Sequence, residues 1–255
     1  MIETPTPPRS HDRLTAFLKA FGLNAQTCAS EPDAMALFVV GEERLRPSHI
    51  VLRCRGGIPA GGEGFVLATA WIGFGGTTNP LVGALPDELK IALHDQPQLQ
   101  GLAELFVAED TVPHCGGAAV RDRLCEVIVV LAVRQAIASG TVNAGLLAGL
   151  AHDTLCPSLI AMHESPDRPW RIEDLAQIAG LSRSRYTAMF VRVVGTTPAA
   201  YLTSWRLAVG HTYLRSGKSV KAVAADVGFG SQEAFSRSFS RRYGCPPSSV
   251  KSAAA

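Results

Sequence analysis

The residue types that most often carry out chemistry are scattered along this 255-residue chain. The histidines that could bind a metal lie far apart and form no H-x-H pair: His49, His94, His114 and His152. The six cysteines form no C-x-x-C pair, so neither a structural zinc site nor a disulfide framework is expected. No G-x-S-x-G elbow is present, and Gly217-Lys218-Ser219 lacks the upstream glycine of a phosphate-binding P-loop. We therefore expect no catalytic residue, no metal, no catalytic cofactor and no enzyme activity.

Two arginines four residues apart, Arg9 and Arg13, are candidates for binding an anionic effector. Guanidinium groups pair bidentately with phosphate and stack on purine rings. Further arginines could add to this anion site: Arg44, Arg46, Arg53 and Arg55. The R-x-x-x-R pair resembles the arginine motif of PilZ domains, although their D/N-x-S-x-x-G partner motif is absent. The resemblance implies cyclic di-GMP as the effector.

Two other effector hypotheses remain open. His114 stands beside Cys115, and a nearby positive charge makes a thiol more reactive, so the chain could instead sense oxidants. Cys28 and Cys125 are expected to be ordinary core residues. The third hypothesis is an apolar or sugar ligand inside the N-terminal domain.

The charges of the chain are divided unevenly between its two parts. Residues 1–156 hold 11 Lys+Arg and 16 Asp+Glu, a balance of −5, whereas residues 157–255 hold 13 and 6, a balance of +7. A basic C-terminal part joined to an acidic N-terminal part is typical of a nucleic-acid-binding domain joined to a regulatory domain. A DNA-binding protein of purely architectural function, without a ligand, fits this division poorly.

Two segments of the C-terminal part repeat one pattern of small and apolar residues. Residues 175–181 (Leu-Ala-Gln-Ile-Ala-Gly-Leu) align with residues 223–229 (Val-Ala-Ala-Asp-Val-Gly-Phe) at an offset of 48. After one extra residue, Gly230, the alignment resumes at an offset of 49 and continues to Pro198 and Pro247. The chain therefore contains two tandem copies of one supersecondary unit.

Each copy predicts a helix, a tight turn and a second helix. A small residue lets the two helices approach closely, a glycine supplies the positive φ that ends the first helix, and a serine caps the second. These residues are Ala176, Gly180 and Ser182 in the first copy and Ala224, Gly228 and Ser231 in the second. The second helices are expected to bury Tyr186, Met189 and Phe190, and then Phe235 and Phe239. This order of residues is typical of a helix-turn-helix.

Residues 198–215 predict one long amphipathic helix between the copies, with Tyr201, Leu202, Trp205, Leu207, Val209 and Leu214 as its apolar positions. Such a helix would hold the two units apart, so that both second helices enter successive major-groove segments of one duplex. That arrangement requires a separation of about 34 Å.

Three motifs of this region resemble the DNA-binding domain of AraC/XylS-type transcriptional regulators. They are Leu175-Ala-x-x-Ala179-Gly180-Leu181-Ser182, Gly195-Thr-Thr-Pro198-x-x-Tyr201-Leu202 and Val223-Ala224-x-x-Val227-Gly228-Phe229-x-Ser231 with Phe235, Arg237 and Phe239. The resemblance implies a seven-helix domain that binds double-stranded promoter DNA and works with RNA polymerase. It favours activation over repression.

The resemblance also assigns candidate DNA contacts by position. The base-reading candidates are Ser184, Arg185, Thr187 and Ala188 in the first copy and Gln232, Glu233, Ser236 and Arg237 in the second. Glutamine can pair with adenine, arginine with guanine, and glutamate can accept from cytosine N4. The phosphate-contact candidates, which set register without reading sequence, are Ser182, Arg183, Arg192, Ser231, Arg241 and Arg242.

The N-terminal part predicts a small β-barrel or jelly roll followed by helices. Short strands are expected at residues 34–40, 49–54 and 65–74, with one or two further strands near 99–111. Residues 118–138 predict an amphipathic helix whose apolar stripe comprises Val120, Leu124, Val127, Ile128 and Leu131, and residues 143–151 predict another helix. In related regulators a cupin-like barrel is followed by helices that pair two subunits, so a homodimer through residues 118–138 is expected. The alternative is that this apolar stripe packs on its own barrel.

The predicted fold class is α+β: a cupin-like or jelly-roll-like barrel with flanking helices, and then an all-α domain of two helix-turn-helix units. The predicted domains are a flexible arm (1–13), an effector-sensing barrel (14–112), a helical dimerisation segment (113–153) and a DNA-binding domain (154–255). The sequence shows neither an apolar run long enough to span a membrane nor a signal peptide, so a cytoplasmic protein without a membrane partner is expected.

Overall fold

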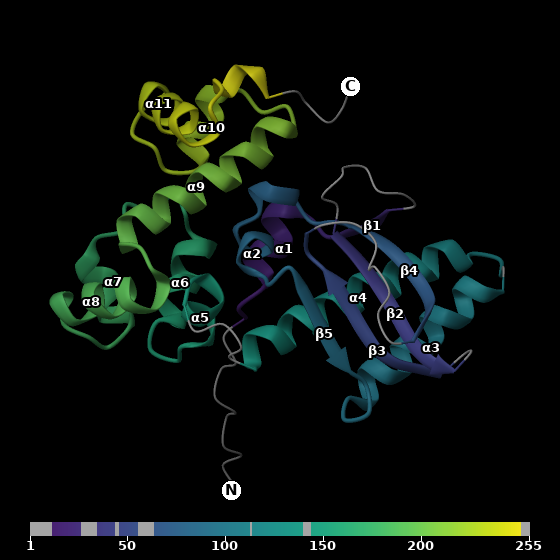
Figure 1. Cartoon of the computed structure of the whole chain (residues 1–255). Coiled ribbons are helices and arrows are strands. Elements are labelled where there is room, and N and C mark those ends of the chain that lie inside the picture. The colour runs from purple at the N-terminus through teal and green to yellow at the C-terminus, as the bar shows by residue number, and fades with distance from the viewer. Residues whose placement is uncertain are drawn as a thin grey trace, which may run out of the picture. The chain divides into compact units, whose positions relative to one another are not determined.

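The computed structural model describes residues 12–26, 35–43, 46–55, 64–112, 114–139 and 144–250 (Figure 1). The chain divides into two compact units. One unit comprises residues 21–142, and the other joins residues 143–255 with the N-terminal segment up to Ala20. Among the described residues, no helix is long and apolar enough to cross a membrane.

The unit of residues 21–142 is built on an antiparallel sheet of five described strands. These are β1 (Asn24–Gln26), β2 (Met35–Glu43), β3 (Arg46–Arg53), β4 (Phe65–Gly73) and β5 (Glu88–Ala92), in the spatial order β1-β4-β2-β3-β5. The central strand β2 is buried from Met35 to Val39, which is typical of a strand covered on both faces. The part of the predicted barrel that the structure describes is therefore one antiparallel sheet with β1 and β5 at its edges.

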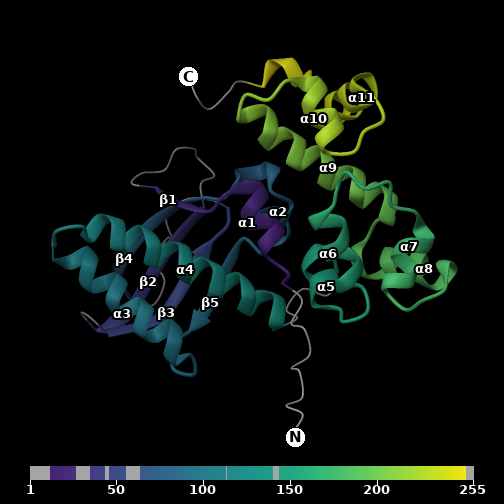
Figure 2. The same ribbon diagram turned by 180° about the vertical axis from the view of Figure 1, so that it is seen from behind.

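Two long helices cover one face of the sheet (Figure 2). Helix α3 (Pro97–Thr111) contacts β3 and β4, and helix α4 (Gly117–Ala138) contacts β1 and β5. The short elements η1 (Gly76–Thr78) and α2 (Pro80–Ala84) lie between β4 and β5. The strand expected near residues 99–111 is wrong, because this segment forms α3. Its buried residues, Leu99, Ala103, Phe106 and Val107, recur at the three- and four-residue intervals of a helix.

In the described residues of the other unit, the regular secondary structure is all helical. It contains α1 (Thr15–Phe21, shared at its last residue with the sheet unit), α5 (Leu146–Ala151), α6 (Cys156–Glu164), α7 (Ile172–Ile178), α8 (Arg183–Val194), α9 (Pro198–Arg215), α10 (Val220–Asp226), α11 (Gln232–Tyr243) and the turn η2 (Pro247–Ser249). The long helix predicted at residues 198–215 is confirmed with the same bounds. Pro198 opens it, and Thr197 caps it by accepting a hydrogen bond from the Ala200 N–H at 3.2 Å.

Helix α1 completes the core of the helical unit. The ring of Phe17, which is fully buried, lies edge-on to His163 at 4.8 Å and to Trp205 at 4.9 Å between ring centroids. His163 Nε2 lies 2.6 Å from the Tyr201 hydroxyl oxygen, and burial lowers the pKa of His163 to about 3. The core therefore holds this histidine neutral, between α6, α9 and α1.

Candidate nucleic-acid interface

The two predicted helix-turn-helix units have the same backbone turn. Gly180, with φ +66°, ends α7, and the Leu181 N–H donates to the Ala176 carbonyl at 2.9 Å. Gly228, with φ +78°, ends α10, and the Phe229 N–H donates to the Ala224 carbonyl at 2.8 Å. Both turns are Schellman motifs, in which glycine adopts the left-handed conformation at no steric cost. Ala176 and Ala224 are buried, as predicted for a close approach of two helices.

Aromatic side chains hold the second helix of each unit against the core. In α8, Tyr186 and Phe190 are fully buried, and the Tyr186 hydroxyl donates to Ser158 Oγ at 3.1 Å. In α11, Phe235 and Phe239 are fully buried, and the Phe239 ring stacks on His211 of α9. Met189, predicted to be buried, is only partly so. Because one face of each helix is fixed in this way, the opposite face is presented to solvent in a defined orientation.

The solvent face of α8 carries the first set of base-reading candidates. Ser184, Arg185 and Ala188 are exposed. Thr187 is partly buried, and its hydroxyl donates to the Arg183 carbonyl at 3.0 Å, which leaves its methyl group and an acceptor for a base. Ser182 stands at the N-cap position but does not cap the helix with its side chain, since its hydroxyl lies 3.4 Å from that of Ser184. The predicted cap by Ser182 is therefore wrong.

The solvent face of α11 carries the second set and is chemically richer. Gln232, Glu233 and Arg237 are exposed, and Ser236 is partly buried. The backbone N–H of Glu233, the Ser231 hydroxyl and the Arg237 guanidinium lower the pKa of Glu233, so that it presents an ionised carboxylate. Ser231 caps the helix as predicted, because its Oγ accepts from the Ala234 N–H at 3.1 Å. This face offers an amide, a carboxylate and a guanidinium to base edges.

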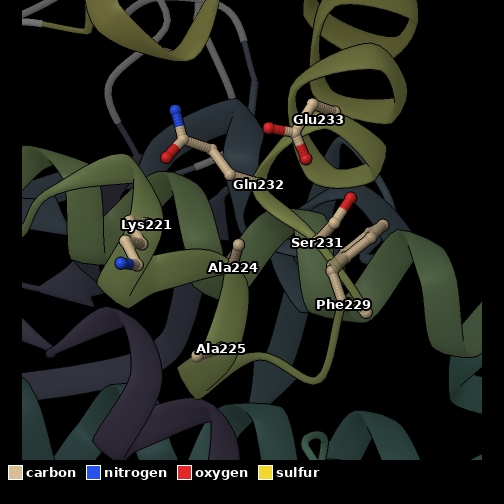
Figure 3. Close-up of a pocket in the computed structure, with 8 residues that line it drawn as sticks. Lys221, Ala224, Ala225, Phe229, Ser231, Gln232 and Glu233 are labelled. Carbon is tan, nitrogen blue, oxygen red and sulfur yellow. The ribbon is translucent and has the colours of Figure 1, made fainter.

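A hollow of about 450 Å³ lies between α10 and the start of α11 (Figure 3). Lys221 stands on the α10 side, and Ser231, Gln232 and Glu233 stand on the α11 side. An ammonium group and the N–H groups of a helix N-terminus both suit phosphate oxygens, and here Lys221 and the start of α11 line the same hollow. Lys221 is a candidate phosphate contact that the sequence reasoning missed. The repeat offset of 48 aligns it with Glu173 of the first unit, so the repeat gave no indication of its charge.

Of the phosphate candidates, some are free to meet DNA and others already have protein partners. Arg192 and Arg241 are exposed. Arg183 pairs with Glu173, with Nη1 and Oε1 at 3.1 Å. Arg242 donates to Ser204 Oγ at 3.4 Å, which holds it against α9. The structure thus brings the first set of candidates together around α8 and the second around α11, with α9 running between them (Figure 1).

The described candidate effector arginines belong to both compact units. Arg9 and Arg44 lie outside those residues, and Arg46 is exposed at the start of β3. Arg53 pairs with Glu88 at 3.0 Å, and Arg55 donates to the Gly83 carbonyl at 2.7 Å and lies 3.4 Å from Asp87. Arg13 lies in the helical unit, 4.0 Å from Asp153.

The candidate redox thiol lies between α3 and α4. Cys115 is exposed, and the neighbouring His114 lies with its Nδ1 3.4 Å from Glu109 Oε2. In contrast, Cys54, Cys125 and Cys156 are buried, as expected for Cys125. Within the described residues, no group of three His, Cys, Asp or Glu side chains could hold a metal ion.

The apolar stripe of α4 divides into two faces. Ile128 is fully buried in its own unit, whereas Val120 and Val127 are 42% and 45% exposed. Leu124 and Leu131 are partly exposed, and together the four residues are spaced four, three and four apart. This is the spacing of a coiled-coil seam.

Comparison with known proteins matches both units to described families. Residues 175–253 match a helix-turn-helix domain, and residues 23–138 match the cupin family. These matches confirm the predicted fold class, an antiparallel cupin-type domain followed by a helical helix-turn-helix domain.

Three of the curated proteins that match this chain carry the names of transcription regulators. An uncharacterized HTH-type transcriptional regulator of Haemophilus influenzae is 33% identical over 172 residues, 67% of this chain and 57% of that protein. A putative AraC-like transcription regulator of Streptomyces lividans is 42% identical over 104 residues, 40% of this chain and 34% of that protein. The RCS-specific HTH-type transcriptional activator RclR of Escherichia coli is 35% identical over 133 residues, 52% of this chain and 47% of that protein. The chain spans about half the length of the curated relatives that it matches.

Proposed function

We propose that this chain, which carries a cupin domain followed by an AraC-type helix-turn-helix domain, is a sequence-specific regulator of transcription that binds promoter DNA through α8 and α11. We propose that it is not an enzyme. The observation that carries the proposal is the pair of exposed polar helix faces, each fixed from behind by buried aromatic residues. The regulator acts in the cytoplasm as an activator that works with RNA polymerase. The similarity to a transcriptional activator supports this direction of control.

The experiment begins with selection of bound sequences from a random duplex pool by the full chain. The affinity of Arg237→Ala and Arg241→Ala is then measured on the selected site and on its single-base variants. Arg237 faces solvent beside Glu233 on the base-reading side of α11, so its loss should weaken binding by about 1–3 kcal/mol and relax the preference at one base pair. Arg241 is the matched control, because loss of a phosphate contact should weaken binding equally on every sequence and lower the salt slope by about one.

Two results would count against this function. One is a selection in which no sequence is enriched over the starting pool. The other is an Arg237→Ala variant that binds all sequences less tightly by one common factor, which would make Arg237 a phosphate contact.

We also propose that the chain forms a homodimer through residues 118–138. The exposed seam of Val120, Leu124, Val127 and Leu131 supports this, because such spacing lets one helix pack along a second copy of itself. Val127→Glu places a charge in that seam and should yield a monomer in sedimentation velocity. Ala118→Glu, a change at an exposed position on the opposite side of the same helix from Val127, is the control. A Val127→Glu variant with the sedimentation coefficient of the parent protein would remove the seam from the interface.

The N-terminal domain is proposed to bind the effector, and cyclic di-GMP is the first compound to test. Arg46 is exposed on β3 and available to a phosphate, whereas Arg53 and Arg55 would have to exchange Glu88 and Asp87 for the ligand. Calorimetric titration of the parent protein, an Arg9→Ala/Arg13→Ala variant and an Arg46→Ala variant separates the two arginine groups. Absence of heat at high ligand concentration in the parent protein would leave oxidants, through the exposed Cys115, and apolar or sugar ligands as the next tests.

A further inference from the structure

Three segments that are distant in sequence meet around one arginine of the long helix. Arg206 lies in the middle of α9, and its guanidinium reaches the loop between α6 and α7. Its Nε donates to the Pro166 carbonyl at 2.6 Å, and its Nη2 donates to the Arg168 carbonyl at 2.9 Å. The guanidinium therefore holds two backbone carbonyls of one loop at once, which uses the planar fork that distinguishes arginine from lysine.

The loop that Arg206 holds is itself fixed to the first helix-turn-helix unit. The Trp170 indole N–H donates to the Ser165 carbonyl at 2.9 Å, and the Arg168 guanidinium lies over the Trp170 ring at 4.2 Å. Arg171, the next residue, is the N-cap of α7. Displacement of this loop would therefore move the start of the first unit.

The turn of the second unit touches the same loop. A Cβ placed on Gly228 would lie 2.7 Å from both the Cα and the carbonyl oxygen of Asp167, and 2.9 Å from Arg206 Nη2. Two of these atoms are backbone, which cannot give way as the end of a flexible side chain can. Gly228 is therefore in van der Waals contact with the loop that leads into the first unit.

The matching glycine of the first unit shows that this contact is not part of the helix-turn-helix turn. Gly180 has a similar positive φ of +66°, but a Cβ placed on it would meet nothing within 4 Å. The turn therefore needs glycine for its backbone conformation in both copies. Only in the second copy must this residue also lack a side chain, because there the turn touches the loop that leads into the first helix-turn-helix unit.

We propose that Arg206, Asp167 and Gly228 form a clamp that fixes the angle between the two recognition helices, and that this clamp restricts the regulator to one spacing of its two DNA half-sites. The proposal rests on the function proposed above. Helix α9 has 18 residues and a length of about 27 Å, which sets the separation of the units along its axis. The clamp lies to the side of that axis and prevents the second unit from pivoting around it.

The expected consequence for DNA follows from duplex geometry. One inserted base pair moves a half-site by about 3.4 Å and turns it by about 35° around the duplex axis. The parent protein cannot follow this turn while the clamp is closed, so it should lose at least about tenfold in affinity. Each base contact that is lost lowers the affinity for DNA by a factor of about 5 to 150. An open clamp should reduce the loss to less than about threefold.

The DNA test uses the full chain and the site obtained by selection, with −1, 0, +1 and +2 base pairs between its halves. Arg206→Lys keeps the positive charge but replaces the two donor nitrogens of a rigid planar fork by one nitrogen on a flexible stem. Arg206→Ala removes the contact altogether. Both should bind the four spacings within about threefold of one another, although more weakly than the parent protein at the selected spacing. Arg215→Ala removes one exposed positive charge from the end of the same helix and should keep the spacing preference of the parent protein.

A second measurement does not depend on DNA. Spin labels on unnatural keto amino acids at Gln177 and Ala222, which are exposed on α7 and α10, report the distance between the two units without reacting with cysteine. The distance distribution should be narrow in the parent protein and in Gly180→Ala, and broad in Arg206→Lys and Gly228→Ala. Gly180→Ala controls for backbone strain at a positive φ, because it makes the same change where a side chain has room.

The outcomes separate this proposal from the function on which it rests. Unchanged distance distributions in Arg206→Lys and Gly228→Ala would overturn the clamp. Broadened distributions with an unchanged spacing preference would overturn its effect on DNA recognition. Broadened distributions in a protein that selects no DNA sequence would keep the clamp as a mechanical feature and reject the regulator function.

Discussion

Replacement of Phe17 tests whether α1 is an essential part of the helical unit. The ring is fully buried and packs on His163 and Trp205, which are themselves almost completely buried, so the surrounding side chains have little freedom to fill the space that Phe17→Ala leaves. Removal of a buried phenylalanine ring costs about 3–5 kcal/mol, and a site that cannot collapse belongs at the upper end. This is a large part of the roughly 5–15 kcal/mol by which a domain is stable.

The assay is hydrogen exchange followed by mass spectrometry, which locates the loss of stability in the chain. Peptides from α6 and α9 should exchange faster in Phe17→Ala, and peptides from β2 and β4 should exchange as in the parent protein. The matched control is Phe21→Ala, four residues further along α1. The Phe21 side chain packs against Gly75 of the sheet unit, where an added Cβ would lie 2.8 Å from its ring, so this variant should instead loosen β2 and β4. The reasoning is refuted if Phe17→Ala leaves α6 and α9 as well protected as before.

Three further predictions follow from contacts described above. Ser231→Ala should lower the free energy of unfolding, measured in urea titrations, by about 0.5–2 kcal/mol, because the Ser231 side chain caps α11. Ser182→Ala should lower it by less, because the Ser182 side chain does not cap α8. Equal losses in the two variants would contradict this reasoning. Folding lowers the pKa of His163 from 6.5 to about 3, so the unfolded chain takes up a proton first as the pH falls. Stability should therefore decrease below pH 6.5, by about 1 kcal/mol per pH unit from this group, and His163→Gln should have a shallower pH dependence between pH 7 and 5 than the parent protein. Burial raises the pKa of Cys54 and of Cys125 to about 12, so iodoacetamide at pH 8 should label the exposed Cys115 and spare the two buried cysteines until urea is added. Mass spectrometry of peptides measures this labelling. Equal labelling of all three cysteines in the native protein would disprove the burial of Cys54 and Cys125.

The order of the helices in the DNA-binding unit could be predicted from the sequence because its determinants are local. Gly180 and Gly228 end helices through their own backbone conformation, and Pro198 begins a helix through its fixed φ. The repeat placed each of these residue types at the same position in both copies, so that Ala176 could be compared with Ala224 and Phe190 with Phe239. The base-reading candidates were assigned by the resemblance to AraC/XylS-type regulators, and most of them are exposed on α8 and α11, whose aromatic residues are buried.

The segment of residues 97–111 shows where local pattern is insufficient. Its apolar residues fit a helix, but a short apolar stretch after several strands also fits one more strand, and only packing against β3 and β4 decided between them. The stripe of α4 likewise gave no indication that Ile128 faces its own unit while Val127 faces solvent.

The contacts that join distant segments were decided by the tertiary structure alone. No spacing in the sequence relates Phe17 to Trp205, Lys221 to the start of α11, or Arg206 to Pro166, because each pair meets only after the helices have packed. The two copies of the repeat look equivalent in sequence, with a glycine at the same place in each. Only the packed structure distinguishes them. A side chain at position 180 would have room, whereas a side chain at position 228 would collide with the backbone of Asp167.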